Sequence, residues 1–253
     1  MSRWLNGRRV VVTRPGDQAE GLCSRLRAMG AEPLEFPVIA IAPPETDGPL
    51  DQAIARLNSY DWMIFTSANG VEYFWARLEA LAARSQPSIA RFPPAKVAAI
   101  GPATAAALHQ RGVQVRLIPA EYRAEAILDE IGDVAGQHVL LPRADIARPA
   151  LAEGLRRKGA QVDEVAAYRT VPATPAPAAF DALRAGVDVI TFTSSSTVRN
   201  FVTQTAGIDY GDPLIACIGP VTATTARELG LRVDVVAEDY TIEGLLDALK
   251  ELG

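Results

Sequence analysis

The stretch IGPATAAALHQRGVQVRLIPAEY, Ile100–Tyr122, recurs as IGPVTATTARELGLRVDVVAEDY at Ile218–Tyr240. Each copy contains an apolar strand end, a Gly-Pro-x-Thr turn and a segment with the length of a helix. Repeats of this kind reveal the architecture of a chain, so they are the first feature to interpret. A whole strand–turn–helix unit that occurs twice in 253 residues indicates a duplicated structure.

Two more pairs of segments repeat in the same order. VVVTRPGDQAEGLCSRLRAMGAEPLEF, Val10–Phe36, resembles VLLPRADIARPALAEGLRRKGAQVDEV, Val139–Val165. DWMIFTSANGVEYF, Asp61–Phe74, resembles DVITFTSSSTVRNF, Asp188–Phe201. Three paired modules in one order favour two homologous halves that derive from a duplicated ancestor.

The modules are predicted to alternate strands with helices. RRVVVT and QHVLLP are short apolar runs rich in branched residues, which are typical of buried parallel strands. Leu22, Leu26 and Met29 share one helical face, and Gly30 is expected to end that helix. Alternating strands and helices predict an α/β fold with two parallel sheets, each covered by helices on both faces.

Two proline-rich segments follow the first module of each half. FPVIAIAPPETDGP, Phe36–Pro49, and VAAYRTVPATPAPAAF, Val165–Phe180, are both interpreted as linkers. If both are linkers, the chain crosses twice between a discontinuous domain and an inserted one. The repeat alone equally allows two sequential domains that divide near residues 132–136.

Composition excludes several classes of function. Apolar residues make up 49% of the chain, charged residues 22%, and the net charge of −5 comes without a basic block, so we expect no nucleic-acid partner. No apolar run reaches the roughly 20 residues that span a bilayer, and no signal peptide is recognised. Cys23 and Cys217 are expected to fill core space, which suits a reducing cytoplasm.

A binding site is predicted at the carboxyl ends of the strands, where parallel sheets bind ligands. Hydroxyl groups, backbone N–H groups and two arginines gather in those turns, and such groups bind carboxylates or phosphates. For any single residue, helix capping is the simpler interpretation. The set as a whole favours an anion-binding cleft between two domains. The candidate residues are Arg14, Ser67, Ala68, Asn69, Gly101, Thr104, Arg143, Ser194, Ser195, Ser196, Gly219 and Thr222.

The common catalytic motifs are absent from the sequence. No G-x-G-x-x-G follows a strand, no nucleophile elbow occurs, and no pair of metal ligands has suitable spacing, so neither a cofactor nor a metal is expected. His109 and His138 are interpreted as surface or capping residues. Tyr168, in the second proposed linker, is the candidate that could donate a hydrogen bond to a leaving group.

These motifs, in this order, resemble the uroporphyrinogen-III synthase family. The resemblance rests on VVVTRP, DWMIFTSANGVEYF, IGPATAAAL, VLLPRADIARPALAEGLRRKGAQVDEVAAYRT and IGPVTATTARELG, and covers nearly the whole chain. It implies two flavodoxin-like domains joined by a two-stranded connector, with residues 1–36 and 172–253 in domain one, 44–164 in domain two, and 37–43 and 165–171 as connector strands.

The resemblance also implies an enzyme of haem and porphyrin biosynthesis. It implies a cofactor-free cytoplasmic lyase, expected as a monomer, that acts on hydroxymethylbilane, a linear tetrapyrrole with eight carboxylates. The product is uroporphyrinogen III, formed by ring closure with inversion of the last pyrrole and loss of water.

Site residues carry over from the family one by one. Tyr168 matches the family's tyrosine, Thr104 and Thr222 match the threonines of the Gly-x-x-Thr turns, and Ser194–Ser196 match its serine loop. Loop identity varies in the family, so Asn69, Arg14 and Arg143 match less specifically. Arg14 and Arg143 could instead pair with Asp17 and Asp145.

Two other classes of function compete with the synthase. One is a cytoplasmic two-domain protein that binds or senses a small anion without catalysis. The other is a nucleotide-dependent enzyme, which the missing phosphate loop disfavours.

Overall fold

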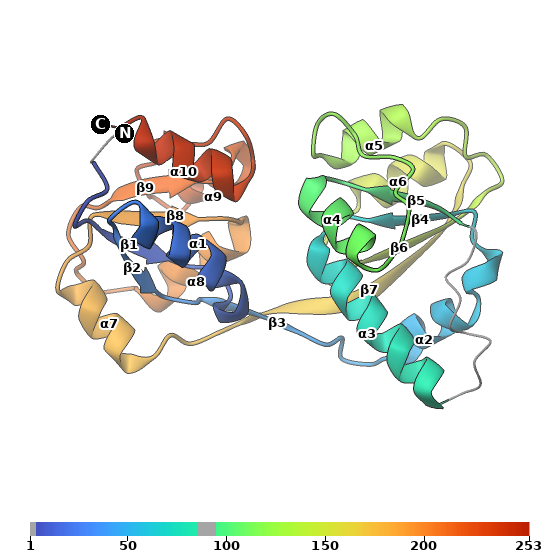
Figure 1. Cartoon of the computed structure of the whole chain (residues 1–253), viewed down its shortest axis with the longest axis horizontal. Helices are drawn as coiled ribbons and strands as arrows, with labels where there is room; N and C mark the ends of the chain where they lie inside the picture. Colours follow the sequence, from blue (N-terminus) through green and yellow to red (C-terminus); the bar gives the residue numbers. More distant parts are fainter. Residues whose placement is uncertain (1–3, 85–94, 253) are drawn as a thin grey trace. The chain divides into compact units, whose positions relative to one another are not determined.

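The chain folds into two compact α/β units. The computed structural model describes residues 4–84 and 95–252, apart from the side chains of Asp17 and Ala124. Unit 1, called domain 1 below, contains the residues through Ala40 and those from Val171 onward, and domain 2 spans Ile41–Thr170. Figure 1 shows helices on both faces of each sheet. The sequential division near residues 132–136 is therefore wrong, and the chain passes between the units twice.

Domain 1 contains a five-stranded sheet of order β10-β9-β8-β1-β2, in which every pairing is parallel. Numbered along domain 1, this is the order 2-1-3-4-5 of flavodoxin-like folds, as predicted. Its elements are β1 (Arg9–Val12), α1 (Gly16–Ala28), β2 (Glu32–Glu35), α7 (Pro177–Arg184), β8 (Val189–Phe192), α8 (Ser195–Gln204), β9 (Leu214–Cys217), α9 (Pro220–Glu228), β10 (Val235–Val236) and α10 (Ile242–Lys250).

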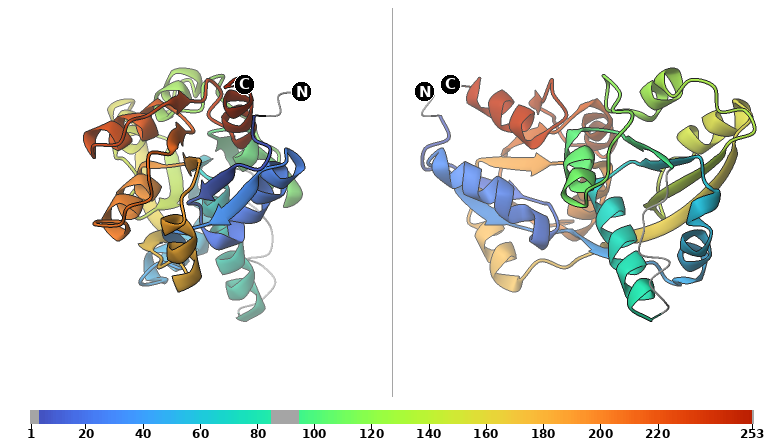
Figure 2. Two further views of the ribbon diagram at one scale, coloured as in Figure 1. Left: turned by 90° about the vertical axis from the view of Figure 1, so that its left-hand side faces the viewer. Right: turned by 45° about the vertical axis from the view of Figure 1, so that its right-hand side comes forward.

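Domain 2 contains a second five-stranded sheet, of order β3-β7-β6-β4-β5. Its elements are β3 (Ile39–Ala42), α2 (Gly48–Ala55), the 3₁₀ helix η1 (Leu57–Ser59), β4 (Trp62–Phe65), α3 (Ala68–Arg84), β5 (Lys96–Ala99), α4 (Pro102–Gln110), α5 (Ala124–Glu130), β6 (His138–Ala144), α6 (Ala150–Arg157) and β7 (Gln161–Pro172). The boundaries between the two units fall within β3 and β7. The long strand β7 and the edge strand β3 can be followed in the right-hand view of Figure 2. Residues 165–171 thus continue a strand of the domain 2 sheet.

The two domains repeat each other in detail. The unit β6-α6-β7 corresponds to β1-α1-β2, and β4-α3-β5-α4 corresponds to β8-α8-β9-α9, as the sequence repeat predicts. An aspartate precedes the equivalent strands β4 and β8. The Asp61 carboxylate accepts the His138 N–H at 2.8 Å, and the Asp188 carboxylate accepts the Arg9 N–H at 2.8 Å. Each aspartate ties the starts of two neighbouring strands together.

Apolar strands are buried on both faces of each sheet. In β1, Val10 and Val12 pack toward α1 and α10, whereas Val11 packs on the opposite face with Phe192 and Phe201. Strand β4 alternates in the same way between two clusters. Because alternate side chains point to opposite faces, an almost wholly apolar strand requires helices on both sides.

The expected end of α1 is confirmed. Gly30 has φ of 83°, and the Ala31 N–H donates to the Leu26 carbonyl, which closes the helix C-terminus. A left-handed residue at this position is most easily a glycine. Gly159 ends α6 in the same way, with φ of 86°.

The described residues contain no helix with the length and apolar character needed to cross a bilayer. They also contain no group of three or more His, Cys, Asp or Glu side chains that could hold a metal ion.

Both cysteine thiols are buried core groups, as predicted. Burial raises the pKa of Cys23 to about 11 and that of Cys217 to about 12. We predict that neither thiol reacts with Ellman's reagent in the native protein at about pH 8, because the thiolate is scarce and access is blocked. Both should react after unfolding in guanidinium. Rapid reaction of either thiol in the native protein would contradict this assignment.

Candidate functional site

The predicted site residues lie along the carboxyl edge of each sheet. Parallel strands end at the same edge, so turns that are distant in sequence are neighbours there. Domain 1 contributes the turns after β1, β8 and β9, and domain 2 contributes the turns after β4 and β5 and the end of β6. The turns of domain 1 carry Arg14, Ser194, Ser195, Ser196, Gly219 and Thr222, and those of domain 2 carry Ser67, Ala68, Asn69, Gly101, Thr104 and Arg143.

Tyr168 lies in β7, at the same edge of the domain 2 sheet. The register shifts between Arg143 and Ala144, so that Arg143 pairs with Ala166 but Ala144 pairs with Tyr168. An extra residue of this kind changes the face to which the following side chains point. The bulge therefore sets the direction of the Tyr168 side chain.

The phenol of Tyr168 is buried and hydrogen-bonded. Only 7% of the residue is exposed, and its hydroxyl lies 3.0 Å from the Ser67 hydroxyl. Its ring centroid is 6.0 Å from that of Tyr73, whose hydroxyl donates to the Ile41 carbonyl at 3.1 Å. Burial raises the pKa of Tyr168; the bond to Ser67 opposes this shift, and the charge of Asp145 adds to it. The phenol is therefore neutral at ordinary pH and can donate a hydrogen bond.

Gly70 makes room for this pair, and sequence reasoning missed it. A Cβ at Gly70 would lie 3.1 Å from the Pro142 carbonyl oxygen, 3.3 Å from the Ser67 Oγ and 3.9 Å from the Tyr168 ring. The signal was present in the repeat, since FTSANG in domain 2 corresponds to FTSSST in domain 1. Glycine stands where the other copy has Thr197.

Ser67 and Ser194 cap their helices, which confirms the capping interpretation for both. The Gly70 N–H donates to the Ser67 Oγ at 3.0 Å. The Thr197 N–H donates to the Ser194 Oγ at 3.2 Å, and the Ser194 N–H donates back to the Thr197 hydroxyl, which completes a capping box.

The other two serines of domain 1 make contacts inside that domain. The Ser195 hydroxyl lies 2.8 Å from the Thr225 hydroxyl on α9. The Ser196 carbonyl accepts a hydrogen bond from the Asn200 side chain at 2.9 Å. Their ligand contacts stay predictions, as do those of Ala68 and Asn69 in the first turn of α3.

The Gly-Pro turns differ from the serine turns because no side chain caps their helices. Gly101 and Gly219 are the N-caps of α4 and α9, in extended conformation, and a proline follows each. Within the described residues, the N–H groups of positions 103, 104, 221 and 222 have no acceptor. These amides and the helix dipole favour an anion at each turn.

A buried threonine accompanies each of these turns. Thr104 is 4% exposed and Thr222 is 5% exposed, yet neither hydroxyl makes a hydrogen bond to any described residue. The capping interpretation is therefore wrong for both threonines. Each turn presents a hydroxyl and backbone amides that are available to a ligand.

The two arginines make local contacts. Arg143 is 8% exposed, its Nη2 lies 2.5 Å from the Glu164 carboxylate, and it donates to the carbonyls of Arg148 and Ala147. Its suggested pairing with Asp145 is wrong, and its guanidinium holds the loop after β6. Arg14 donates to Gln18 at 3.4 Å, and the Asp17 side chain lies outside the described residues. Ligand contacts of both arginines stay predictions.

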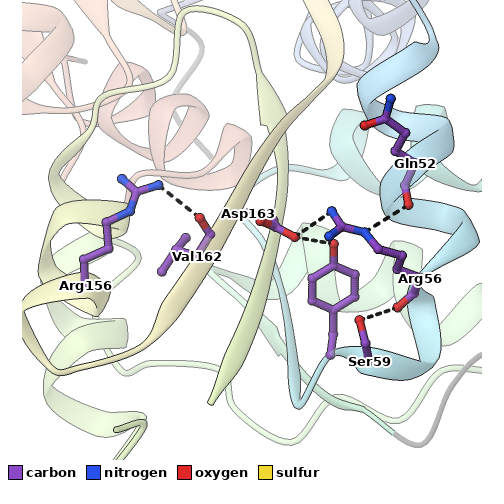
Figure 3. Close-up of polar contacts among 7 residues, drawn as sticks. Gln52, Arg56, Ser59, Arg156, Val162 and Asp163 are labelled. Carbon is purple, nitrogen blue, oxygen red and sulfur yellow. Dashed lines mark hydrogen bonds and ion pairs between the residues drawn. The ribbon is translucent and has the colours of Figure 1, made fainter. Parts of the chain in front are cut away.

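Other polar groups and cavities lie apart from these turns. One cavity of about 360 Å³ is lined by residues 205–211, and another of about 240 Å³ is lined by Trp62, Lys96 and Arg116; neither includes a predicted site residue. Figure 3 shows Arg56 pointing toward Asp163 on β7. The Tyr60 hydroxyl donates to the same carboxylate at 2.6 Å, and burial together with this bond raises its pKa. Tyr60 therefore connects the end of η1 to β7 through Asp163, and its hydroxyl proton is already donated to that carboxylate. It is not a second candidate for the role of Tyr168.

The two capping serines provide a matched test. We predict that Ser67→Ala and Ser194→Ala each lower the free energy of unfolding by about 1 kcal/mol, the usual loss for an N-cap. Only Ser67→Ala should also change the environment of Tyr168, because only Ser67 contacts it. Urea unfolding measures the stability, and ultraviolet titration measures the pKa of the tyrosine. An unchanged tyrosine titration in Ser67→Ala would show that this hydrogen bond is absent in solution.

Comparisons with known proteins agree with this architecture. The family model described as uroporphyrinogen-III synthase HemD matches residues 20–247. A uroporphyrinogen-III synthase from Synechococcus elongatus is 39% identical, over 98% of this chain and 96% of its own length. Another, from Salmonella typhimurium, is 30% identical over 95% and 99% of the two chains.

Solved structures show the same fold. A mutant uroporphyrinogen III synthase from Thermus thermophilus matches with a TM-score of 0.64, at 21% identity over 97% of this chain and 98% of that one. The Helicobacter pylori uroporphyrinogen-III synthetase also matches with a TM-score of 0.64, at 18% identity over 98% and 100% of the two chains. At this level of identity they establish the fold alone. From the family model and the 39% identical relative, the chain belongs to the uroporphyrinogen-III synthase family.

Proposed function

We propose that this chain is a uroporphyrinogen-III synthase that converts hydroxymethylbilane into uroporphyrinogen III. The reaction is a cyclising elimination of water, so the enzyme is a lyase of haem biosynthesis. The observation that carries the proposal is the pair of uncapped Gly-Pro turns, one in each domain. Each has a buried threonine hydroxyl and first-turn amides with no acceptor among the described residues. Such donors suit a substrate that carries many carboxylates.

The reaction depends on shaping the substrate. Loss of the hydroxyl group and of the N–H proton of the same pyrrole ring, together one molecule of water, leaves an azafulvene. The far pyrrole then attacks the azafulvene through its substituted carbon. The spiro intermediate then fragments and recloses with that ring inverted. Holding the two reacting carbons together supplies much of the rate enhancement in a step of this kind.

Tyr168 is proposed to assist departure of the hydroxyl group. Because burial raises the pKa of Tyr168, a full proton transfer would leave a buried phenolate, which is unfavourable. We therefore assign Tyr168 a hydrogen bond to the departing oxygen. Ser67 is proposed to donate to the phenol oxygen, which leaves the phenol proton directed at the substrate.

The direct test supplies freshly generated hydroxymethylbilane and separates the type I and type III isomers. The proposal expects type III as the main product. Type I alone, at the uncatalysed rate, would contradict it. Tight binding of the substrate without formation of type III would favour the non-catalytic anion-binding protein.

We predict that Tyr168→Phe lowers kcat on the order of 100-fold, the loss expected when one hydrogen-bond donor to the charge that develops in the transition state is removed. Stability should change little, because the ring is retained. Tyr210→Phe is the matched control, since Tyr210 packs against Phe201 in domain 1 and lies outside the proposed site. Unchanged turnover in Tyr168→Phe would show that water or the substrate itself, and not Tyr168, assists departure of the hydroxyl group.

We predict that Thr104→Val and Thr222→Val each raise KM about tenfold, the effect of one lost hydrogen bond to a carboxylate. Valine keeps the buried shape, and no hydrogen bond to a described residue is lost in the free protein. Thermal unfolding should therefore stay close to that of the wild type. A fall in stability with normal kinetics would show that the threonines serve only packing.

A further inference from the structure

A tyrosine lies over each Gly-Pro turn. A Cβ at Gly101 would be 3.3 Å from the Tyr122 ring, and one at Gly219 would be 3.0 Å from the Tyr240 ring. Both glycines have extended backbone that any residue can adopt, so the ring contact is what favours glycine there. The two tyrosines end the two copies of the repeat.

Local hydrogen bonds order the backbone beside each tyrosine. Tyr240 precedes Thr241, whose side chain caps α10 by accepting the Gly244 N–H at 3.0 Å. Tyr122 precedes Arg123, the N-cap of α5, and the Arg123 N–H donates to the Glu121 carbonyl at 2.8 Å. Each tyrosine thus stands directly before the N-cap residue of the next helix.

Neither tyrosine is a core residue. Tyr122 is 43% exposed and Tyr240 is 52% exposed, and neither hydroxyl makes a hydrogen bond to a described residue. Large aromatic residues usually contribute to stability by burial. Each ring is instead half-exposed and packs on the glycine that begins a turn with available donors, so a ligand bound at that turn can reach it.

We propose that Tyr122 and Tyr240 are substrate-binding residues, and that each forms a carboxylate subsite with the Gly-Pro turn beneath its ring. The proposal rests on the proposed function and extends it. In domain 2 the donors are the first-turn amides of α4, the Thr104 hydroxyl and the Tyr122 phenol. In domain 1 they are the first-turn amides of α9, the Thr222 hydroxyl and the Tyr240 phenol.

The chemistry of the donors suits a carboxylate. Its two oxygens accept about four hydrogen bonds, and each turn offers two amides, a threonine hydroxyl and a phenol. The phenol ring shields one side of the turn from water, which strengthens the bonds to the anion. No arginine or lysine is required, because the helix N-terminus supplies the positive end of a dipole.

Duplication of the subsite has a consequence for affinity. Each subsite can bind one of the several carboxylates of the substrate. Loss of one phenol should weaken binding moderately, and loss of both should multiply the two effects if the subsites are independent.

The test compares Tyr122→Phe, Tyr240→Phe and the double variant with the wild type and with Tyr210→Phe. Each single change should raise KM about 5- to 10-fold with kcat nearly unchanged, and the double variant should show the product of the two effects. Tyr210→Phe should match the wild type. Unchanged KM in both single variants of an enzyme that makes type III would overturn the proposal and leave the proposed function intact.

Two further variants test the glycines. Gly219→Ala should displace the Tyr240 ring, and Gly101→Ala should disturb Tyr122 less, because its added Cβ would have 3.3 Å of clearance against 3.0 Å. KM should therefore rise more in Gly219→Ala. If both glycine variants have the KM and the thermal unfolding of the wild type, the proposed role of the two tyrosine rings in substrate binding is contradicted.

Binding of uroporphyrin III, followed by its fluorescence, supplies a readout that does not require turnover. Weaker binding by the phenylalanine variants supports the subsites even if the wild type makes no type III isomer. The proposed subsites are overturned if the wild type and all variants bind uroporphyrin III equally well, or if the wild type does not bind it.

Discussion

Burial of each sheet on both faces is the constraint on which the rest of the structure depends. Helices cover both sides, so Val10, Val11 and Val12 are all fully buried and their strand has no exposed face for a polar side chain. A polar side chain of such a central strand can meet water or a ligand where the strand ends. At the carboxyl edge, the helix N-termini add amides that lack partners in their own helix. The location and the anion preference of the candidate site follow from the same packing.

The duplicated halves have diverged in what they do with equivalent positions. In domain 1, Thr197 completes a capping box with Ser194. In domain 2, Gly70 replaces that threonine, and the Tyr168 ring lies close to the space that a side chain would have filled. This one difference distinguishes the two turns. The turn of domain 1 only caps its helix, whereas the turn of domain 2 also contacts the phenol of Tyr168. The Gly-Pro turns have kept the same construction in both halves, including the tyrosine above the glycine.

Much of this could be predicted from the sequence because it is encoded locally. The alternation of apolar strands and amphipathic helices, the stop at Gly30 and the order of the repeated modules all depend on neighbouring residues. What the sequence could not provide was long-range contact. The β-bulge opposite Tyr168 and the pairing of Arg143 with Glu164 depend on the register of two strands. The approach of Tyr122 and Tyr240 to glycines of the preceding turn depends on loop geometry, although their recurrence at the end of each repeat was a usable signal.

The insertion of domain 2 into domain 1 has a consequence for synthesis on the ribosome. Domain 2 is one continuous segment, Ile41–Thr170, and all its strands have been made before the second part of domain 1 emerges. Strand β1, made first, lacks its neighbour β8 until residue 192 has been added. The N-terminal segment must therefore wait while the inserted domain folds, with one edge of the apolar strand β1 unpaired even though β2 is available for the other edge. Nascent chains that stall in this interval would expose an open strand edge, which is a site for aggregation or chaperone binding.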